Sequence, residues 1–190
     1  MSTNNLTPTM MAIIVIAILA IGAAIWMFIQ KKRTQDLRSK FGPEYDKAID
    51  VHGDRWHAEC DLEKREKRVA LFHIRSLQDH ERLKYAEDWL AEQSLFVDDP
   101  RTAVKHADRL VQDVMKQRGY PVSDFEQNAT DLSVDHPRVV ENYRIAHEIA
   151  VRDARGQGNT EDLRKAMVCY RALFEDLLEQ RVDRPVEVRR

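Results

Sequence analysis

The stretch MMAIIVIAILAIGAAIWMFI, residues 10–29, decides the architecture of this chain. It has the length that a helix needs to cross the roughly 30 Å hydrocarbon core of a bilayer. Its isoleucine, leucine, valine and phenylalanine residues each favour insertion by about 0.3–0.6 kcal/mol, and no charged residue opposes them. Trp26 lies near the far end, where an aromatic ring suits the membrane interface. The sequence therefore predicts a transmembrane helix over residues 10–30, after a short polar tail at residues 1–9.

A cleaved signal peptide is the competing interpretation of this stretch. Such a peptide has a basic first region, followed by an apolar run of about 7–15 residues. Residues 1–9, MSTNNLTPT, contain no lysine or arginine, and the apolar run is longer. The small residues that could imitate a cleavage site, Ala20, Ala23 and Ala24, lie in the middle of the run. These features favour an uncleaved anchor.

The charges that flank the anchor predict its orientation. Five basic residues follow it, and no charged side chain precedes it; the five are Lys31, Lys32, Arg33, Arg38 and Lys40. By the positive-inside rule, the N terminus should lie outside and the rest of the chain in the cytoplasm. The same five residues are candidate contacts with anionic headgroups of the lipid bilayer, at about 1 kcal/mol per charge. The simpler interpretation is that they only set the topology.

The charge balance of the remaining chain argues against a nucleic-acid partner. The chain has 190 residues, with 30 basic and 32 acidic side chains. Only three of these charges precede residue 34, so residues 34–190 carry 27 basic against 32 acidic side chains. Phosphate contacts need a net basic face, and an acidic domain does not supply one.

The segment after the anchor is predicted to be all-α, as a soluble bundle of about six helices. Six glycines and six prolines are few for this length, and no alternating strand pattern occurs. We divide it into a basic juxtamembrane helix and linker (31–53), an α-helical domain (54–181) and a disordered tail (182–190). Within the domain we expect helices over 54–72, 76–96, 99–119, 123–132 and 136–156, and a last helix opened by Thr160.

Capping patterns and apolar stripes support these helices. Ser76–Asp79 and Ser123–Glu126 resemble capping boxes, and Asp99 before Pro100 is a strong start signal. His136-Pro137 is expected to begin a further helix. The expected stripes recur at helical spacing: Leu83, Ala86, Trp89, Leu90 and Phe96; Ala103, Val104, Ala107, Leu110, Val111 and Val114; Val140, Tyr143, Ala146, His147 and Ile149 or Ala150; and Leu163, Ala166, Met167, Tyr170, Leu173, Phe174 and Leu177.

No residue constellation points to catalysis or to a cofactor. His52, His57 and Cys60 are the nearest approach to a metal cluster, but zinc needs four converging ligands and Gly53 interrupts the helix between the histidines. His147 is expected to be a hydrogen-bonded core histidine. The charged run DLEKREKR, residues 61–68, is expected to be a solvated face, and less often a docking face. Cys60 and Cys169 are expected to be unpaired thiols, because a cytoplasmic domain disfavours a disulfide. We therefore predict no metal, no cofactor and no enzyme.

Three segments resemble an uncharacterised family of bacterial single-pass membrane proteins, sometimes labelled "secreted". They are LRSKFGPEYDKAID (37–50), FVDDPRTAVKHADRLVQDVMKQRGYPVSDFE (96–126) and LSVDHPRVVENYRIAHEIAV (132–151). The resemblance implies a helical membrane protein over most of the domain. It implies no activity, cofactor or site residue.

Two hypotheses for function follow. The first is a membrane-anchored helical interaction or scaffold protein, whose domain binds a protein partner or self-associates. The alternative is a membrane-tethered sensor with a small-molecule pocket near Trp89, Tyr143 and Tyr170.

Overall fold

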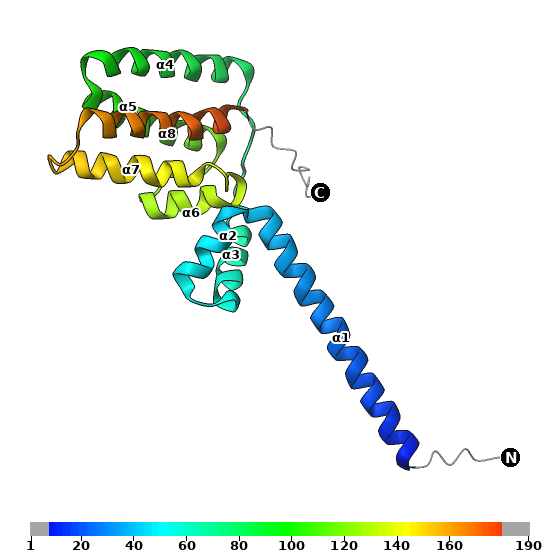
Figure 1. The fold of residues 1–190 in the computed structure, drawn as a ribbon. Helices are drawn as coiled ribbons and strands as arrows, with labels where there is room; N and C mark the ends of the chain where they lie inside the picture. Colours follow the sequence, from blue (N-terminus) through cyan, green and yellow to red (C-terminus); the bar gives the residue numbers. More distant parts are fainter. Residues whose placement is uncertain (1–7, 180–190) are drawn as a thin grey trace. The chain divides into compact units, whose positions relative to one another are not determined.

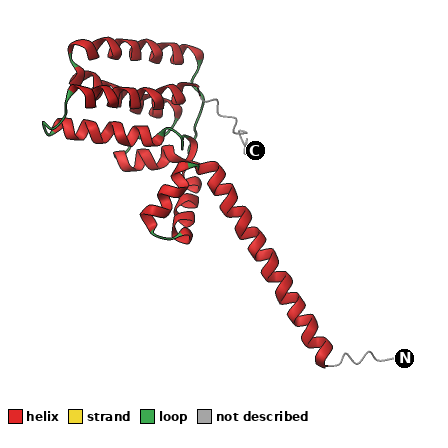
Figure 2. Ribbon diagram, viewed as in Figure 1, coloured by secondary structure: helices red, strands yellow, loops and turns green. Residues whose placement is uncertain are grey.

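The computed structural model describes residues 8–179, and all the regular structure in that range is α-helical (Figure 2). The helices are α1 (Pro8–Phe41), α2 (Pro43–His52), α3 (Arg55–Val69), α4 (Asp79–Asp98), α5 (Pro100–Arg118), α6 (Phe125–Asp135), α7 (Val140–Ala154) and α8 (Thr160–Glu179). The predicted all-α class is confirmed. The six helices expected over 54–181 are α3 to α8, and the segment before them supplies α2.

The chain forms two compact units, which divide between Lys40 and Phe41. The first unit contains nearly all of α1, and the second contains α2 to α8. The sequence predicts a juxtamembrane helix and linker over residues 31–53, whereas α2 lies in the second unit. Pro8 and Thr9, expected in the N-terminal tail, belong to α1. The rest of that tail and the expected disordered tail at 182–190 lie outside the described residues.

The second unit has four helices packed side by side and a smaller pair attached, and of the four α5 and α8 run parallel, since their starts line one cavity and Arg118 at the end of α5 donates to the Leu177 carbonyl at the end of α8. Packing runs from α4 to α5, from α5 to α8 and from α8 to α7, as Figure 1 shows. Helix α6 packs on α7, and the α2–α3 pair joins through α3 and α6. The main apolar core lies between α5, α7 and α8, with Trp89 of α4 stacked on Phe174 of α8 at a ring distance of 4.8 Å.

The predicted stripes of α5 and α8 are confirmed in full, because every expected residue is buried. The prediction of the apolar stripe of α4 is wrong in part. Trp89 is buried, but Leu83 and Leu90 are 67% and 62% exposed. Residues 86, 89 and 96 share the inward face of the helix, whereas 83 and 90 lie about 100° further round. In α7, His147 is half-buried and stacks on the Phe125 ring at 3.6 Å, with no hydrogen bond found, contrary to expectation.

Helix caps lie one or two residues from several of the expected positions. Gln78 and Glu81 form the capping box of α4, in place of Ser76 and Asp79. Asp124 rather than Ser123 caps α6, accepting from the Gln127 amide at 2.9 Å. Asn159 accepts from the Asp162 amide at 2.8 Å, so Thr160 is not the cap of α8. His136 and Pro137 lie in the turn before α7, which begins at Val140. Asp99 caps α5 as predicted, accepting from the Thr102 amide at 3.1 Å.

Candidate interaction surfaces

The apolar part of α1 is the first candidate surface. A segment from Val15 to Phe41 is long and apolar enough to cross a membrane, with a mean hydropathy of 1.7 in its most apolar window. None of that window is buried inside the protein. Large side chains such as Ile16, Leu19 and Phe28 are 66–70% exposed. An unburied row of this size is costly in water and stable in hydrocarbon.

Five basic residues follow the apolar run at residues 10–29 and lie on the last three turns of α1. Lys31, Lys32, Arg38 and Lys40 are exposed, and Arg33 is half-buried. At 100° per residue these positions point in several directions around the helix axis, so they form a collar rather than a stripe. Such a collar places positive charge all round the helix over these three turns. Contact of these residues with headgroups stays a prediction.

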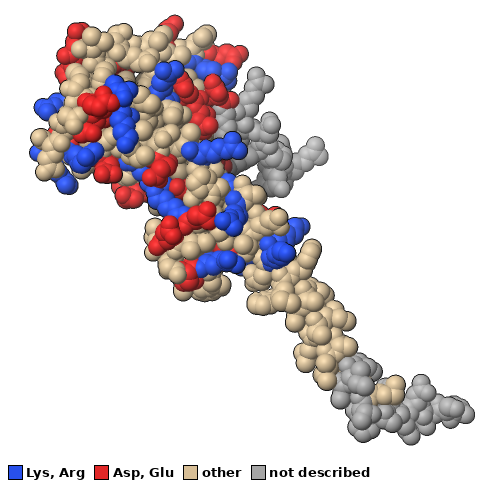
Figure 3. Space-filling model, in the orientation of Figure 1, with Lys and Arg blue, Asp and Glu red and all other residues tan. Residues whose placement is uncertain are grey.

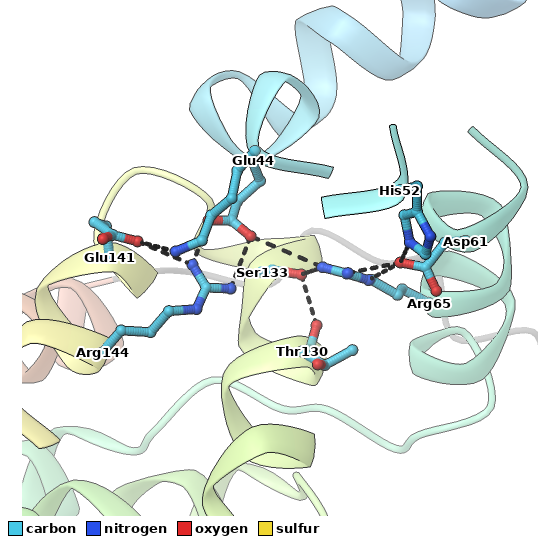
Figure 4. A network of polar contacts seen from close by, with 9 residues as sticks. Glu44, His52, Asp61, Arg65, Thr130, Ser133, Glu141 and Arg144 are labelled. Carbon is cyan, nitrogen blue, oxygen red and sulfur yellow. Dashed lines mark hydrogen bonds and ion pairs between the residues drawn. The ribbon is translucent and has the colours of Figure 1, made fainter. Parts of the chain in front are cut away.

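A buried ionic network in the second unit is the feature that the sequence did not predict (Figure 4). Its centre is Glu44 of α2, whose side chain is 3% exposed. Arg144 of α7 donates two hydrogen bonds to this carboxylate, at 2.5 and 2.8 Å. Arg65 of α3 approaches it from the other side at 3.8 Å. A bidentate arginine–carboxylate pair is among the stronger charge-assisted contacts, so α2 is fastened to α7 by charge.

Further contacts extend the network along α3 and join α3 to α6. Arg65 also donates to Asp61 at 2.8 Å and to the Ser133 hydroxyl at 3.3 Å. Arg68 donates to Asp131 of α6 at 2.9 Å, and that carboxylate is fully buried. The prediction of a solvated face for residues 61–68 is therefore wrong for Arg65, which is 17% exposed, whereas Arg68 is 45% exposed; both arginines dock α3 onto α6. Their partners on α6, Ser133 and Asp131, lie more than sixty residues away, and a local charge pattern carries no information on them.

The network is also the reason for one pKa shift at its edge. Lys47 of α2 donates to Glu141 of α7 at 2.5 Å, and Arg144 donates to the same carboxylate at 3.1 Å. Both contacts favour the charged carboxylate, Lys47 more strongly, and the pKa of Glu141 is lowered. In this network the acidic and basic groups neutralise one another, so their role is to hold α2 against α7.

The candidate metal ligands do not converge. The Nε2 of His52 lies 3.5 Å from Asp61, and His57 pairs with the Asp54 carboxylate that caps α3. Cys60 is half-buried, Cys169 is buried, and both thiols are free. Within the described residues, no group of three histidine, cysteine or carboxylate side chains could hold a metal ion.

The three aromatic residues of the sensor hypothesis are core residues. Trp89, Tyr143 and Tyr170 are at most 5% exposed, and the two tyrosine rings meet edge to face at 6.2 Å. The Tyr170 hydroxyl donates to Asp108 at 3.0 Å. Burial raises the pKa of this carboxyl above its ordinary value, although the hydroxyl opposes the shift.

Two cavities of about 290 and 350 Å³ lie at the surface of the second unit, and neither is lined by these aromatic residues. The smaller is lined by the starts of α5 and α8, and the larger by α4 and α5, with Glu92 beside His106. Glu92 and His106 are paired at 3.0 Å.

The outer face of α4 is the last candidate surface. Leu83, Leu90 and Val97 are 67%, 62% and 82% exposed. They lie at intervals of seven residues, so they form one line along the helix. In Figure 3, uncharged atoms are interspersed with acidic side chains along the edge of the molecule where α4 lies.

Comparison with protein-family models, with curated proteins and with solved structures found no match, which is consistent with an uncharacterised family. The bacterial origin and the membrane nature that the resemblance implies stay predictions.

Proposed function

We propose that this chain is a single-pass membrane protein that holds a helical interaction module at the cytoplasmic face of a membrane. The observation that carries the proposal is the unburied apolar length of α1, followed at once by the basic collar. The first feature supports insertion, and the second supports a cytoplasmic position for the helices that follow.

We propose binding rather than catalysis for the module. Several of its buried charged groups are paired across helices, as Glu44 is with Arg144 and Asp131 with Arg68. Charges that are used to fasten helices together are not poised to transfer a proton or attack a substrate. The exposed line on α4 offers a surface for a macromolecular partner, because a run of large apolar side chains at a helix surface is a common docking feature.

Membrane extraction and topology mapping test the anchor. The full chain should stay in the pellet when bacterial membranes are washed with alkaline carbonate, and it should keep its N-terminal residues. A C-terminal fluorescent reporter that works only in the cytoplasm should be active, and a C-terminal phosphatase that works only in the periplasm should be inactive. Release by carbonate, or an active phosphatase, would contradict the proposal.

A matched pair of variants tests the basic collar. Replacement of Lys31, Lys32 and Arg33 by glutamine should reduce the fraction of correctly oriented chains, because the charge asymmetry is weakened. Replacement of three exposed lysines of the second unit, Lys64, Lys67 and Lys105, should leave orientation unchanged. Equal effects of the two sets would exclude a specific role of the collar.

A further inference from the structure

The exposed surface of α4 has a second line of residues beside the apolar one. Lys84, Ala91 and Asp98 are exposed, and they too lie at intervals of seven. Seven residues are nearly two turns of helix, so this line runs parallel to that of Leu83, Leu90 and Val97. One line is apolar. The other has a small residue in the middle and opposite charges at its two ends.

This pattern is complementary to itself when one copy of the helix is reversed. Lys84 and Asp98 lie equally far on either side of Ala91, as Leu83 and Val97 do around Leu90. In an antiparallel pair of α4 helices, each lysine meets the aspartate of the other copy. Leucine meets valine at both ends and leucine meets leucine at the centre. A twofold dimer uses the same patch on both subunits, so it requires this kind of self-complementarity.

A parallel pairing of the same helices loses these attractions. Its twofold axis runs along the helices and puts the two flanking lines on opposite sides of the contact, so neither Lys84 nor Asp98 would face its opposite charge in the other copy. The charges therefore select one direction. The small Ala91 side chain at the centre of the flanking line allows the two helices to approach closely.

We propose that α4 is the interface of an antiparallel homodimer, with a twofold axis that passes between Leu90 and Ala91. The inference rests on the proposed function, since it names a second copy of this chain as the partner of the interaction module. Three apolar side chains per copy form a small interface. Anchoring both copies in one membrane supports such an interface, because confinement raises the effective concentration of each for the other.

Disulfide cross-linking of the full chain in native membranes tests the geometry. Lys84→Cys and Asp98→Cys should form a disulfide dimer when the two variants are co-expressed, and neither should form one efficiently alone. Ala91→Cys should cross-link to itself, because it lies beside the axis. The unmodified chain, with Cys60 and Cys169, gives the background, and Lys105→Cys on α5 is an exposed control.

Charge exchange tests the same pairing without added thiols. Lys84→Asp and Asp98→Lys should each weaken dimerisation roughly tenfold, since two attractive pairs become repulsive. The two variants mixed together should recover the wild-type level. Leu90→Asp should abolish dimerisation. All these positions are exposed, and unchanged circular dichroism should show that each variant is folded.

The outcomes separate this inference from the proposed function. Cross-linking no higher than in the Lys105→Cys control, in a chain that still resists carbonate extraction, would overturn the α4 dimer and leave the membrane anchor standing. Self-cross-linking of Lys84→Cys as strong as its cross-linking to Asp98→Cys would overturn the antiparallel arrangement. Release of the chain from the membrane would overturn the proposed function instead.

Discussion

Replacement of Glu44 by glutamine should measurably loosen the second unit. The glutamine has nearly the same shape, so the change removes the negative charge and leaves the packing. The lost charge lies at the centre of the ionic network, on a side chain that is 3% exposed and that accepts from both terminal nitrogens of Arg144. Breaking a buried pair by removing one partner costs about 3–5 kcal/mol when the other charge is left alone.

The structure lowers this figure for Glu44→Gln. Arg144 keeps its contact with Glu141 at 3.1 Å, and Arg65 keeps its contacts with Asp61, at 2.8 Å through Nε and 2.6 Å through Nη2. The guanidinium of Arg144 is also 20% exposed, so water can compensate in part. We therefore expect a loss of about 2–3 kcal/mol in the free energy of unfolding. For a domain of this size, that corresponds to a drop of about 4–12 °C in Tm.

Thermal and chemical unfolding of the full chain in mild detergent, followed by circular dichroism, measures this loss. Glu175→Gln is the matched control, because its pair with Arg171 is more than half exposed and should contribute about 0–1 kcal/mol. Hydrogen exchange should locate the effect. Amides of α2 and α3 should exchange faster in Glu44→Gln, while those of α5 and α8 change less.

A double-mutant cycle with Arg144→Met decides whether the pair itself is responsible. Residues in direct ionic contact show coupling energies of about 0.5–3 kcal/mol, whereas independent sites add. Additive effects, or a Glu44→Gln variant as stable as Glu175→Gln, would refute the interpretation that charge fastens α2 to α7.

Two further predictions concern backbone strain and pH. Gly119→Ala should destabilise the protein by about 2–4 kcal/mol, because Gly119 has a φ of 95° and an added Cβ would lie 2.4 Å from the His73 carbonyl oxygen. The control is Gly53→Ala, where φ is 76° and an added Cβ would have no neighbour within 4 Å. It should cost only about 1 kcal/mol when both variants are unfolded by heat or denaturant. Equal losses would show that the close approach to His73 is unimportant. Burial raises the pKa of Asp108 above its unfolded value, so this carboxyl favours folding below the unfolded pKa, and that contribution is lost as pH rises through the folded pKa. The stability of the wild type relative to Asp108→Asn, which can still accept from Tyr170, should therefore fall with rising pH across that window; a constant difference would contradict the assignment.

Helices whose apolar stripe has one clear direction could be predicted from sequence. In α5 and α8 all expected inward residues are buried, because each helix packs on the core along its whole length. The end of α5 was equally clear. Gly119 adopts a left-handed conformation that few other residues tolerate, and Pro121 follows it.

Helix α4 shows where the same reasoning stops. Its sequence carries two apolar lines, one through Ala86, Trp89 and Phe96 and another through Leu83, Leu90 and Val97. Periodicity finds both, but it cannot say which one meets the core and which meets solvent. Only the position of α4 at the edge of the helix row, where one face has no neighbouring helix among residues 8–179, separates them (Figure 1).

The ionic network could not be predicted for a different physical reason. Glu44 and Arg144 are a hundred residues apart, and each looks like an ordinary surface residue in its own helix. Charges are usually solvated, so a sequence interpretation assigns them to the surface. Their burial depends on the close approach of α2 and α7, which no local pattern encodes.

The network and the α4 surface use charge for different purposes, and this makes their roles separable. Charges of the network lie inside the fold, where opposite partners compensate for lost hydration, and removing one weakens the fold. Lys84 and Asp98 of α4 remain in water in the single chain, so changing them costs the fold little and alters only what meets that face. Because α2 begins two residues after α1 ends, the covalent path from α1 to the bundle runs through the helix that Glu44 fastens. A variant that loosens this attachment without changing α4 should therefore lose stability and keep its cross-linking pattern, whereas an α4 variant should do the reverse.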